Sequence, residues 1–254
     1  MSNEPLTAQV WRMRLLCQST DGGAVQSFRP GQFVEVQVPS FFLRRPISVC
    51  DAEEQDGTVV LTLIYKIVGG GTQEMSSLPV GMELDLLAPL GNGYALSRAD
   101  EKALLIGGGV GIPPLYMMAK ELVRMGRRVE VIMGFNTASE AFYVREFEAL
   151  GCSVRVTTAD GSMGTKGFVT DAVSALYDLS KEGSVSAVPY YYACGPMPML
   201  RAIAKQLGRN GEMSMEERMG CGFGVCMGCS IQTASGPCRV CTDGPVFPVS
   251  ELLI

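Results

Sequence analysis

The sequence predicts two folded domains followed by a small module: an antiparallel β-barrel, a doubly wound α/β domain with a parallel sheet, and a cysteine-rich C-terminal segment. Three observations lead to this prediction. Strand-like runs separated by Gly and Pro occupy residues 1–98, strands alternate with helices over residues 99–210, and five of the nine cysteines lie within residues 211–254. A chain of 254 residues is long enough to bury two separate cores.

The first region contains runs in which apolar and polar residues alternate or β-branched residues dominate. GQFVEVQVP (31–39) and GTVVLTLIYKIV (57–68) have this character. LPVG (78–81) and APLGNG (88–93) then supply turn signals. Several short strands at this spacing predict a small antiparallel barrel.

The second region repeats a strand followed by a helix, which predicts parallel βαβ units and a doubly wound sheet. From residue 211 onward the pattern is typical of loops. The expected strand and helix units are KALLIGGGVGIPPLYMMAKELVRMG (102–126), RRVEVIMGF (127–135) with ASEAFYVREFEALG (138–151), SVRVTTAD (153–160) with KGFVTDAVSALYD (166–178), and VPYYYACGP (188–196) with MPMLRAIAKQLG (197–208).

Composition limits the kinds of partner. The net charge of −5 and the lack of a basic stripe argue against nucleic acid, and no apolar run reaches the roughly 18 residues that a membrane span needs. The N-terminal MSNEPLTAQVWRMRLL carries acid and proline where a secretory signal needs a basic start and an apolar core. We therefore expect a cytoplasmic protein with no membrane partner. Thiols stay reduced in the cytoplasm, so clustered cysteines indicate a metal site.

Cys221, Cys226 and Cys229 form the spacing C-x4-C-x2-C, with Cys238 and Cys241 as candidates for a fourth ligand. This is the plant-type ferredoxin spacing for a [2Fe–2S] cluster. The interspersed glycines permit a loop whose backbone N–H groups point at the sulfur atoms. A structural zinc site is the alternative, although zinc ligands usually come as two separated C-x2-C pairs.

A glycine turn opens the second region. In LLIGGGVGIPPLY (104–116), Gly108, Gly109 and Gly111 lie between a predicted strand and a predicted helix, where free N–H groups suit a pyrophosphate. A strand–helix turn without a ligand is the structural alternative.

Cys194, Gly195 and Pro196 follow a late strand, at the edge where open parallel sheets bind their ligands. The sequence allows either a contact with a nicotinamide or a buried thiol at the end of the strand. After the second strand, GFNTASEAFY (134–143) has no Arg or Lys for a 2′-phosphate, which favours NAD over NADP.

A flavin is implied because a nicotinamide exchanges a hydride whereas a [2Fe–2S] cluster exchanges single electrons, and flavins do both. Arg45 can pair with a phosphate or lie over the ring, and Ser48 can bond a ring heteroatom. Gly70, Gly71 and Thr72 can approach a pyrophosphate through backbone N–H groups. The alternatives are a solvated strand end and an ordinary turn.

With RRPIS, GGGT, GGGVGIPP and CGPMPML in this order, the chain resembles the ferredoxin–NADP reductase superfamily. The cysteine cluster, PLGNGY (89–94) and VCTDGPVF (240–247) make it resemble, over essentially its whole length, the electron-transfer subunits of NAD-dependent (class 1B) dihydroorotate dehydrogenases. This resemblance implies an FAD-binding barrel over residues 1–98, an NAD-binding domain over residues 99–210 and a [2Fe–2S] module over residues 211–254.

The resemblance also implies roles for individual residues. It assigns Cys241 as the fourth cluster ligand, because the family's ligand directly precedes D-G-P-V-F; the extra Cys238 in a short loop is a departure. It assigns FAD contacts to Arg45, Pro46, Ile47, Ser48, Ile64, Tyr65, Lys66, Gly71 and Thr72.

The expected function is electron transfer. An FMN-containing catalytic subunit, in a heterotetramer with two copies of each chain, would oxidise dihydroorotate to orotate in pyrimidine biosynthesis. Electrons would reach NAD through this chain's [2Fe–2S] cluster and FAD. No catalytic acid or base is expected on this chain, because substrate deprotonation would take place on the partner; the absence of histidine is consistent with this. The alternatives are the same module in a sulfide dehydrogenase, ferredoxin:NADP reductase or sulfite reductase complex, and a regulatory protein with a zinc-stabilised tail.

Overall fold

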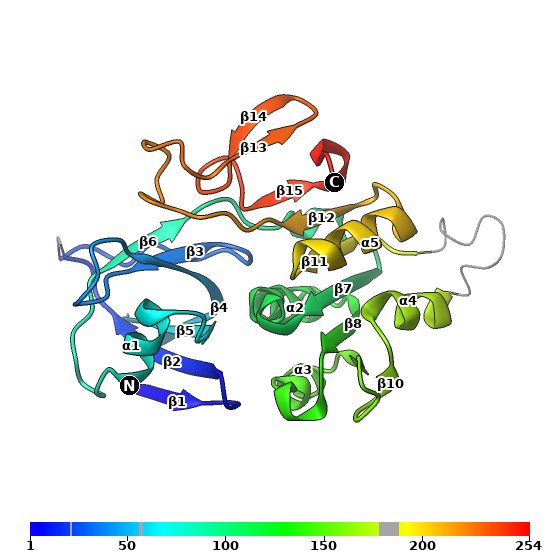
Figure 1. Cartoon of the computed structure of the whole chain (residues 1–254), viewed down its shortest axis with the longest axis horizontal. Coiled ribbons are helices and arrows are strands. Elements are labelled where there is room, and N and C mark those ends of the chain that lie inside the picture. Colours follow the sequence, from blue (N-terminus) through cyan, green and yellow to red (C-terminus); the bar gives the residue numbers. More distant parts are fainter. Residues whose placement is uncertain (21, 56–57, 178–187) are drawn as a thin grey trace.

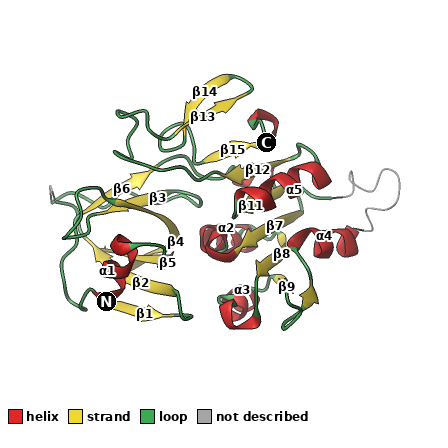
Figure 2. Ribbon diagram, viewed as in Figure 1, coloured by secondary structure: helices red, strands yellow, loops and turns green. Residues whose placement is uncertain are grey.

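The structure is a computed structural model that describes residues 1–20, 22–55, 58–177 and 188–254. Two β-sheets lie side by side, and the C-terminal segment crosses above both (Figure 1). Helices cover the second sheet, whereas the first has one short helix beside it (Figure 2). The predicted order, an antiparallel domain and then a doubly wound α/β domain, is confirmed. None of the helices in the described ranges is long and apolar enough to cross a membrane.

The N-terminal sheet has six strands, in the order β1-β2-β5-β4-β3-β6, all of them antiparallel to their neighbours. Strand β4 pairs with β3 through residues 45–48 and with β5 through residues 49–55, and its register shifts between Val49 and Asp51. The extra residue there is Cys50, and such a bulge bends a sheet. The bounds are β1 (Ser2–Pro5), β2 (Val10–Cys17), β3 (Phe33–Val36), β4 (Arg45–Gln55), β5 (Thr58–Lys66), α1 (Gly70–Ser77) and β6 (Leu86–Leu90).

The bent sheet encloses an apolar core. Val34 and Val36 of β3, Leu61 and Leu63 of β5, and Met75 of α1 are fully buried together in it. These strand residues are two apart, so they point to the same face of the sheet. The opposite face of β3, with Phe33 and Glu35, is thereby turned toward the rest of the molecule.

The second sheet has seven strands in the order β10-β9-β8-β7-β11-β12-β15. All neighbours are parallel except β12 and β15. The order reverses direction between β7 and β11, which makes this the switch point where such sheets bind ligands. The bounds are β7 (Lys102–Gly108), α2 (Tyr116–Arg124), β8 (Arg128–Phe135), α3 (Val144–Ala149), β9 (Ser153–Thr158), β10 (Thr165–Lys166), α4 (Val169–Tyr177), β11 (Tyr191–Cys194), α5 (Met197–Leu207), β12 (Gly211–Ser214) and β15 (Val246–Pro248).

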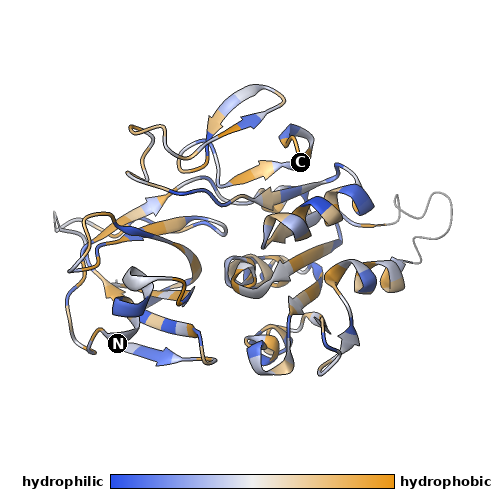
Figure 3. Ribbon diagram, viewed as in Figure 1, coloured by the Kyte–Doolittle hydropathy of each residue, from blue (hydrophilic) through white to orange (hydrophobic). Residues whose placement is uncertain are grey.

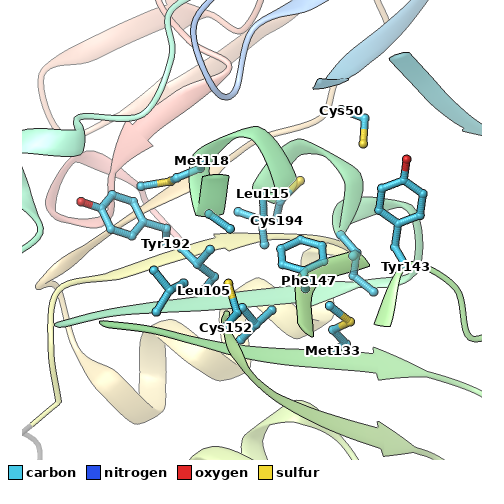
Figure 4. Packing of buried hydrophobic residues seen from close by; sticks show 14 of the residues in the cluster. Cys50, Leu105, Leu115, Met118, Met133, Tyr143, Phe147, Cys152, Tyr192 and Cys194 are labelled. Carbon is cyan, nitrogen blue, oxygen red and sulfur yellow. The ribbon is translucent and has the colours of Figure 1, made fainter. Parts of the chain in front are cut away.

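Two apolar clusters lie on the two faces of this sheet. Leu105 and Met133 pack with α2 and α3 on one face, whereas Leu104 and Ile132 pack with α4 and α5 on the other. Figure 4 shows the first cluster, in which Cys50 of the N-terminal sheet also takes part. Figure 3 shows mainly hydrophobic residues along the central strands and hydrophilic ones along the edge strand β1.

The structure corrects several expectations of detail. The helix expected over residues 138–151 is confined to α3, because Tyr143 before it has a φ of 63° and cannot continue a right-handed helix. The region from residue 211, expected to be loops, contains β12, β15 and a hairpin of β13 (Ser230–Thr233) and β14 (Gly236–Arg239). The sequence did not predict these strands because they are too short to show periodicity. The sheet thus extends past residue 210. Residues 57 and 178, at the ends of two expected elements, lie outside the described residues.

Candidate redox cofactor sites

A cavity of about 790 Å³ lies at the switch point, between the second sheet and the barrel. It is bordered by the carboxyl ends of β7, β8 and β9 and by the start of α5, and residues 7–10 and Lys66 close it from the barrel side. A dinucleotide fits a cleft of this volume and position. Its lining includes Gly108, Gly109, Val110, Asn136, Glu140, Phe168, Pro196 and Met199.

The two glycine motifs of this domain meet at the cavity. A Cβ atom on Gly111 would overlap the carbonyl group of Cys194 and lie 2.6 Å from the Cα atom of Gly195. A Cβ atom on Gly108 would lie 2.6 Å from Sδ of Met199. Strands β7 and β11 are neighbours, so the glycine turn and the Cys-Gly-Pro turn approach backbone to backbone. Only glycine permits this approach.

Cys194 lies behind the cavity wall and is not among the residues that line it. Its side chain is 2% exposed and belongs to the first apolar cluster. Burial raises the pKa of its thiol to about 12, so the group stays protonated. Of the two roles left open by the sequence, this geometry favours the buried thiol at the end of a strand.

Glu140 is a site residue that the sequence analysis did not identify. Glu140 lines the cavity just after β8, where its Oε2 accepts a hydrogen bond of 2.8 Å from Nδ2 of Asn136. Of the described residues that line the cavity, the charged ones are Lys66, from the N-terminal domain, and Glu140, from the α/β domain. The absence of Arg and Lys after β8 was visible in the sequence. The acid itself was the stronger signal, because a carboxylate repels a 2′-phosphate.

The RRPIS stretch forms the first residues of β4, with the Arg45 side chain folded over the loop before it. Its guanidinium carbon lies 4.5 Å from the centroid of the Phe41 ring, and its Nη1 donates a hydrogen bond of 2.6 Å to the Leu43 carbonyl. A Cβ atom on Gly71 would lie 2.6 Å from Cζ of Arg45. The structure therefore brings together the two flavin motifs that the sequence separates.

Gly70, Gly71 and Thr72 begin helix α1, whose N-terminus carries a partial positive charge beside Arg45. The Thr72 hydroxyl is engaged within the turn, where its Oγ1 accepts a hydrogen bond of 2.9 Å from the backbone N–H of Val68. The first backbone N–H groups of the helix together with the Arg45 guanidinium suit a pyrophosphate.

The second flavin stretch is largely buried. Ile64 packs in the first cluster of the α/β domain, and Tyr65 packs in the barrel core with its hydroxyl donating to Oδ1 of Asn3 at 2.9 Å. Lys66 is the member that reaches a cavity. Ile47 is also buried, while Pro46 and Ser48 are half-buried on the opposite face of β4.

The cysteine loop gathers its thiols as two pairs. The backbone N–H of Cys226 points at Sγ of Cys221 at 3.5 Å, and that of Cys241 points at Sγ of Cys229 at 3.5 Å. Cys238 lies apart in the hairpin, with its Sγ 3.7 Å from Oγ1 of Thr233. The structure thus places Cys241 with the loop cysteines.

Two pairs of thiolates suit a two-iron cluster, because each iron takes two protein ligands and shares the bridging sulfides. Structural zinc sites more often take their ligands from two separated C-x2-C pairs than from one C-x4-C-x2-C loop. The donor set therefore fits [2Fe–2S].

Two buried oxygen atoms lie beside this loop. Among the described residues, Oε1 of Glu35 and Oγ1 of Thr242 are buried without a hydrogen-bond partner. Glu35 faces Gly222 and Thr242 faces Gly224, both glycines of the loop. Each such atom costs about 1–3 kcal/mol.

The electrostatics of the loop favour thiolates at its open end. Burial opposes ionisation of Cys221, but backbone N–H groups of Cys226, Phe223 and Val225 lower its pKa to about 6. At the inner end, burial and the neighbouring Cys229 raise the pKa of Cys241 to about 11. The loop exposes three apolar side chains, with Phe223 54%, Val225 74% and Met227 55% exposed.

Two family profiles match the chain. The Oxidoreductase NAD-binding domain matches residues 105–205, and the Iron-sulfur cluster binding domain of dihydroorotate dehydrogenase B matches residues 216–253.

Relatives match over most of the chain. The "Dihydroorotate dehydrogenase B (NAD(+)), electron transfer subunit" of Fusobacterium nucleatum is 43% identical over 232 residues, or 89% of this chain and 87% of the relative. The protein of the same name from Geobacillus kaustophilus is 43% identical over 256 residues, or 95% of each chain. That from Shouchella clausii is 42% identical over 236 residues, or 89% of this chain and 87% of the relative.

Solved structures share the fold. The NADH-dependent reduced ferredoxin–NADP oxidoreductase, described for flavin-based electron bifurcation, superposes with a TM-score of 0.83 and 29% identity over 98% of this chain and 87% of that chain. Phthalate dioxygenase reductase superposes with a TM-score of 0.63 and 18% identity over 98% of this chain and 75% of that chain. The second likeness concerns the fold alone.

Proposed function

The chain belongs to the family of electron transfer subunits of dihydroorotate dehydrogenase B, and from this premise we propose which of its residues bind each cofactor. It is an oxidoreductase subunit that carries electrons between a catalytic dihydroorotate dehydrogenase subunit and NAD, with [2Fe–2S] and FAD as its own cofactors. When bound, these groups allow one-electron and hydride chemistry to be exchanged. The observation that carries the proposal is the cysteine loop, which pairs its four cysteines and in which Gly222 lies against Glu35 of β3.

Three parts of the chain hold the three cofactors in this proposal. Residues 1–98 bind FAD, with the pyrophosphate on Arg45 and the N-terminus of α1, and with Pro46 and Ser48 beside the ring. Residues 99–210 bind NAD in the cavity, with its pyrophosphate on the turn that contains Gly108, Gly109 and Gly111. Residues 211–254 hold the cluster through the cysteines that pair in the structure, namely Cys221, Cys226, Cys229 and Cys241.

Further proposals concern the partner. Apolar side chains exposed at the tip of the cysteine loop are typical of a protein contact surface, so this loop is assigned to the interface with the catalytic subunit. That subunit is proposed to carry FMN and to form a cytoplasmic heterotetramer with two copies of each chain. Electrons entering at the interface would then meet the cysteine pairs first.

The test is an assay of the native complex, isolated without oxygen through a tag on this chain. Dihydroorotate should drive NAD reduction, read at 340 nm, and the complex should contain iron, sulfide, FAD and FMN. If NADH bleaches the flavin absorbance but dihydroorotate has no effect, the module serves another complex. The 29% identity to the ferredoxin–NADP oxidoreductase makes that the second candidate.

A further inference from the structure

Glu35 is a buried carboxyl group that no step of the proposed function uses. It lies on β3 with a side chain that is 2% exposed, and its Oε1 has no hydrogen-bond partner among the described residues. Arg44 is close, but its guanidinium donates to the backbone carbonyl of Glu35, at 3.4 Å, and to Asp85. A buried carboxyl group without a partner costs free energy, so its presence calls for an explanation.

The carboxyl group lies directly beneath the cysteine loop. A Cβ atom on Gly222 would lie 2.6 Å from Cγ and 2.8 Å from Oε1 of Glu35. Gly222 has a φ of 76° and follows Cys221, so the loop turns at this point of contact. A side chain at position 222 would push the loop away from β3.

On its other side, Glu35 neighbours the proposed flavin stretch at the start of β4. Glu35 pairs with Pro46 across the antiparallel β3 and β4, and Phe33 pairs with Ser48. Residues opposite each other in such a pair point to the same face. Glu35 thus shares a face with the two half-buried members of the flavin stretch and contacts the cluster loop.

We propose that Glu35 is a positioning residue through which the barrel sets the reduction potential of the cluster on the adjacent cysteines; this inference rests on the proposed function. The potentials of iron–sulfur clusters depend on net charge, hydrogen bonds and solvent exposure around them. Burial raises the pKa of the Glu35 carboxyl group to about 7, against the opposing effect of the nearby Arg44 guanidinium. Above that pH, the carboxylate opposes the extra negative charge that reduction adds. It lowers the potential of the cluster and favours onward transfer of the electron to the flavin.

The test measures the midpoint potential of the cluster by EPR-monitored redox titration of the native complex at about pH 8.5, where Glu35 is ionised despite its raised pKa. Glu35→Gln keeps the shape but removes the charge, and Glu35→Asp keeps the charge but withdraws it from Gly222. Glu54→Gln is the matched control, an exposed carboxylate near the far end of β4, in the part of the strand that pairs with β5 instead of β3. Iron and sulfide per chain are measured for every variant.

We expect Glu35→Gln to retain the cluster and to make its midpoint potential more positive. The equilibrium constant between the oxidised and the reduced cluster should change about threefold or more. This corresponds to a shift of about 28 mV or more, because a tenfold change is 59 mV for one electron. Glu35→Asp should shift the potential in the same direction by less, and Glu54→Gln should match the wild type. If Glu35→Gln lost its iron, the Glu35→Asp shift would decide the outcome.

Two other outcomes have distinct meanings. A loaded Glu35→Gln or Glu35→Asp variant with an unchanged potential overturns the inference and leaves the proposed function intact. A wild-type complex without iron overturns the proposed function, and the inference with it.

Discussion

Gly111 lies so close to the end of β11 that any side chain at position 111 would overlap the carbonyl group of Cys194. The glycine turn and the Cys-Gly-Pro turn are far apart in the sequence, yet they form one backbone contact at the floor of the cavity. The requirement for glycine at this position comes from its neighbour across the sheet, because Gly111 has no positive φ.

Gly111→Ala should therefore lower both stability and nucleotide binding. The added methyl group forces the glycine turn away from the end of β11, with an expected cost of about 1–3 kcal/mol in the free energy of unfolding. Urea unfolding and NADH titration measure the two effects. Gly69→Ala is the control, because position 69 has open space and an extended φ of −178°. Equal stability of the two variants would contradict the packing argument.

Arg45→Met should yield a complex with less bound FAD. The substitution removes the guanidinium next to Gly71 and the N-terminus of α1, where we place the pyrophosphate. The ratio of FAD to protein, from flavin released by denaturation and separated from FMN by chromatography, gives the result. Arg14→Met, which removes an arginine on β2 that pairs with Glu53 at 3.8 Å, should keep the wild-type ratio.

Cys241→Ser should lose the cluster, whereas Cys238→Ser should keep it. Cys241 lies beside Cys229, but Cys238 lies in the hairpin next to Thr233. Iron analysis and the visible spectrum of each variant distinguish them. The reverse result, with the cluster lost only from Cys238→Ser, would show that the loop rearranges around the metal.

Glu140→Gln should relax the preference for NAD over NADP. Removing the carboxylate from the cavity wall after β8 lessens repulsion of a 2′-phosphate, so kcat/KM for NADPH relative to NADH should rise about tenfold. Glu148→Gln, on the exposed side of α3, serves as the control. An unchanged ratio would place the adenosine ribose elsewhere in the cavity.

Glu212 should give stability a measurable pH dependence. Burial raises its pKa above the ordinary 4.5, against the hydrogen bond of 2.9 Å that its Oε2 accepts from the backbone N–H of Ala95. A raised pKa in the folded state gives stability that is fully present below pH 4.5 and is lost as the pH rises through the folded pKa. The free energy of unfolding, measured with urea from about pH 4 to 8, should therefore fall more steeply with pH for the wild type than for Glu212→Gln.

Local chemistry made much of the site predictable. The glycine turn was visible because strand, turn and helix follow each other in the chain, and the C-x4-C-x2-C spacing places three thiols within one loop. The same reasoning failed for β12 to β15, because strands of four residues or fewer show no periodicity. It also missed Glu140 and Glu35, which belong to no short motif.

The sequence by itself determined the order of the two folds, the cysteine spacing and the glycine turns, because each depends on residues close together in the chain. Only the tertiary structure decided which distant residues meet. The packing of β3 against the C-terminal loop places Glu35 under Gly222, and the pairing of β7 with β11 places Gly111 on Cys194. The fold of the loop brings Cys241 rather than Cys238 to Cys229. These contacts depend on burial and strand register across the whole chain, which no local pattern encodes.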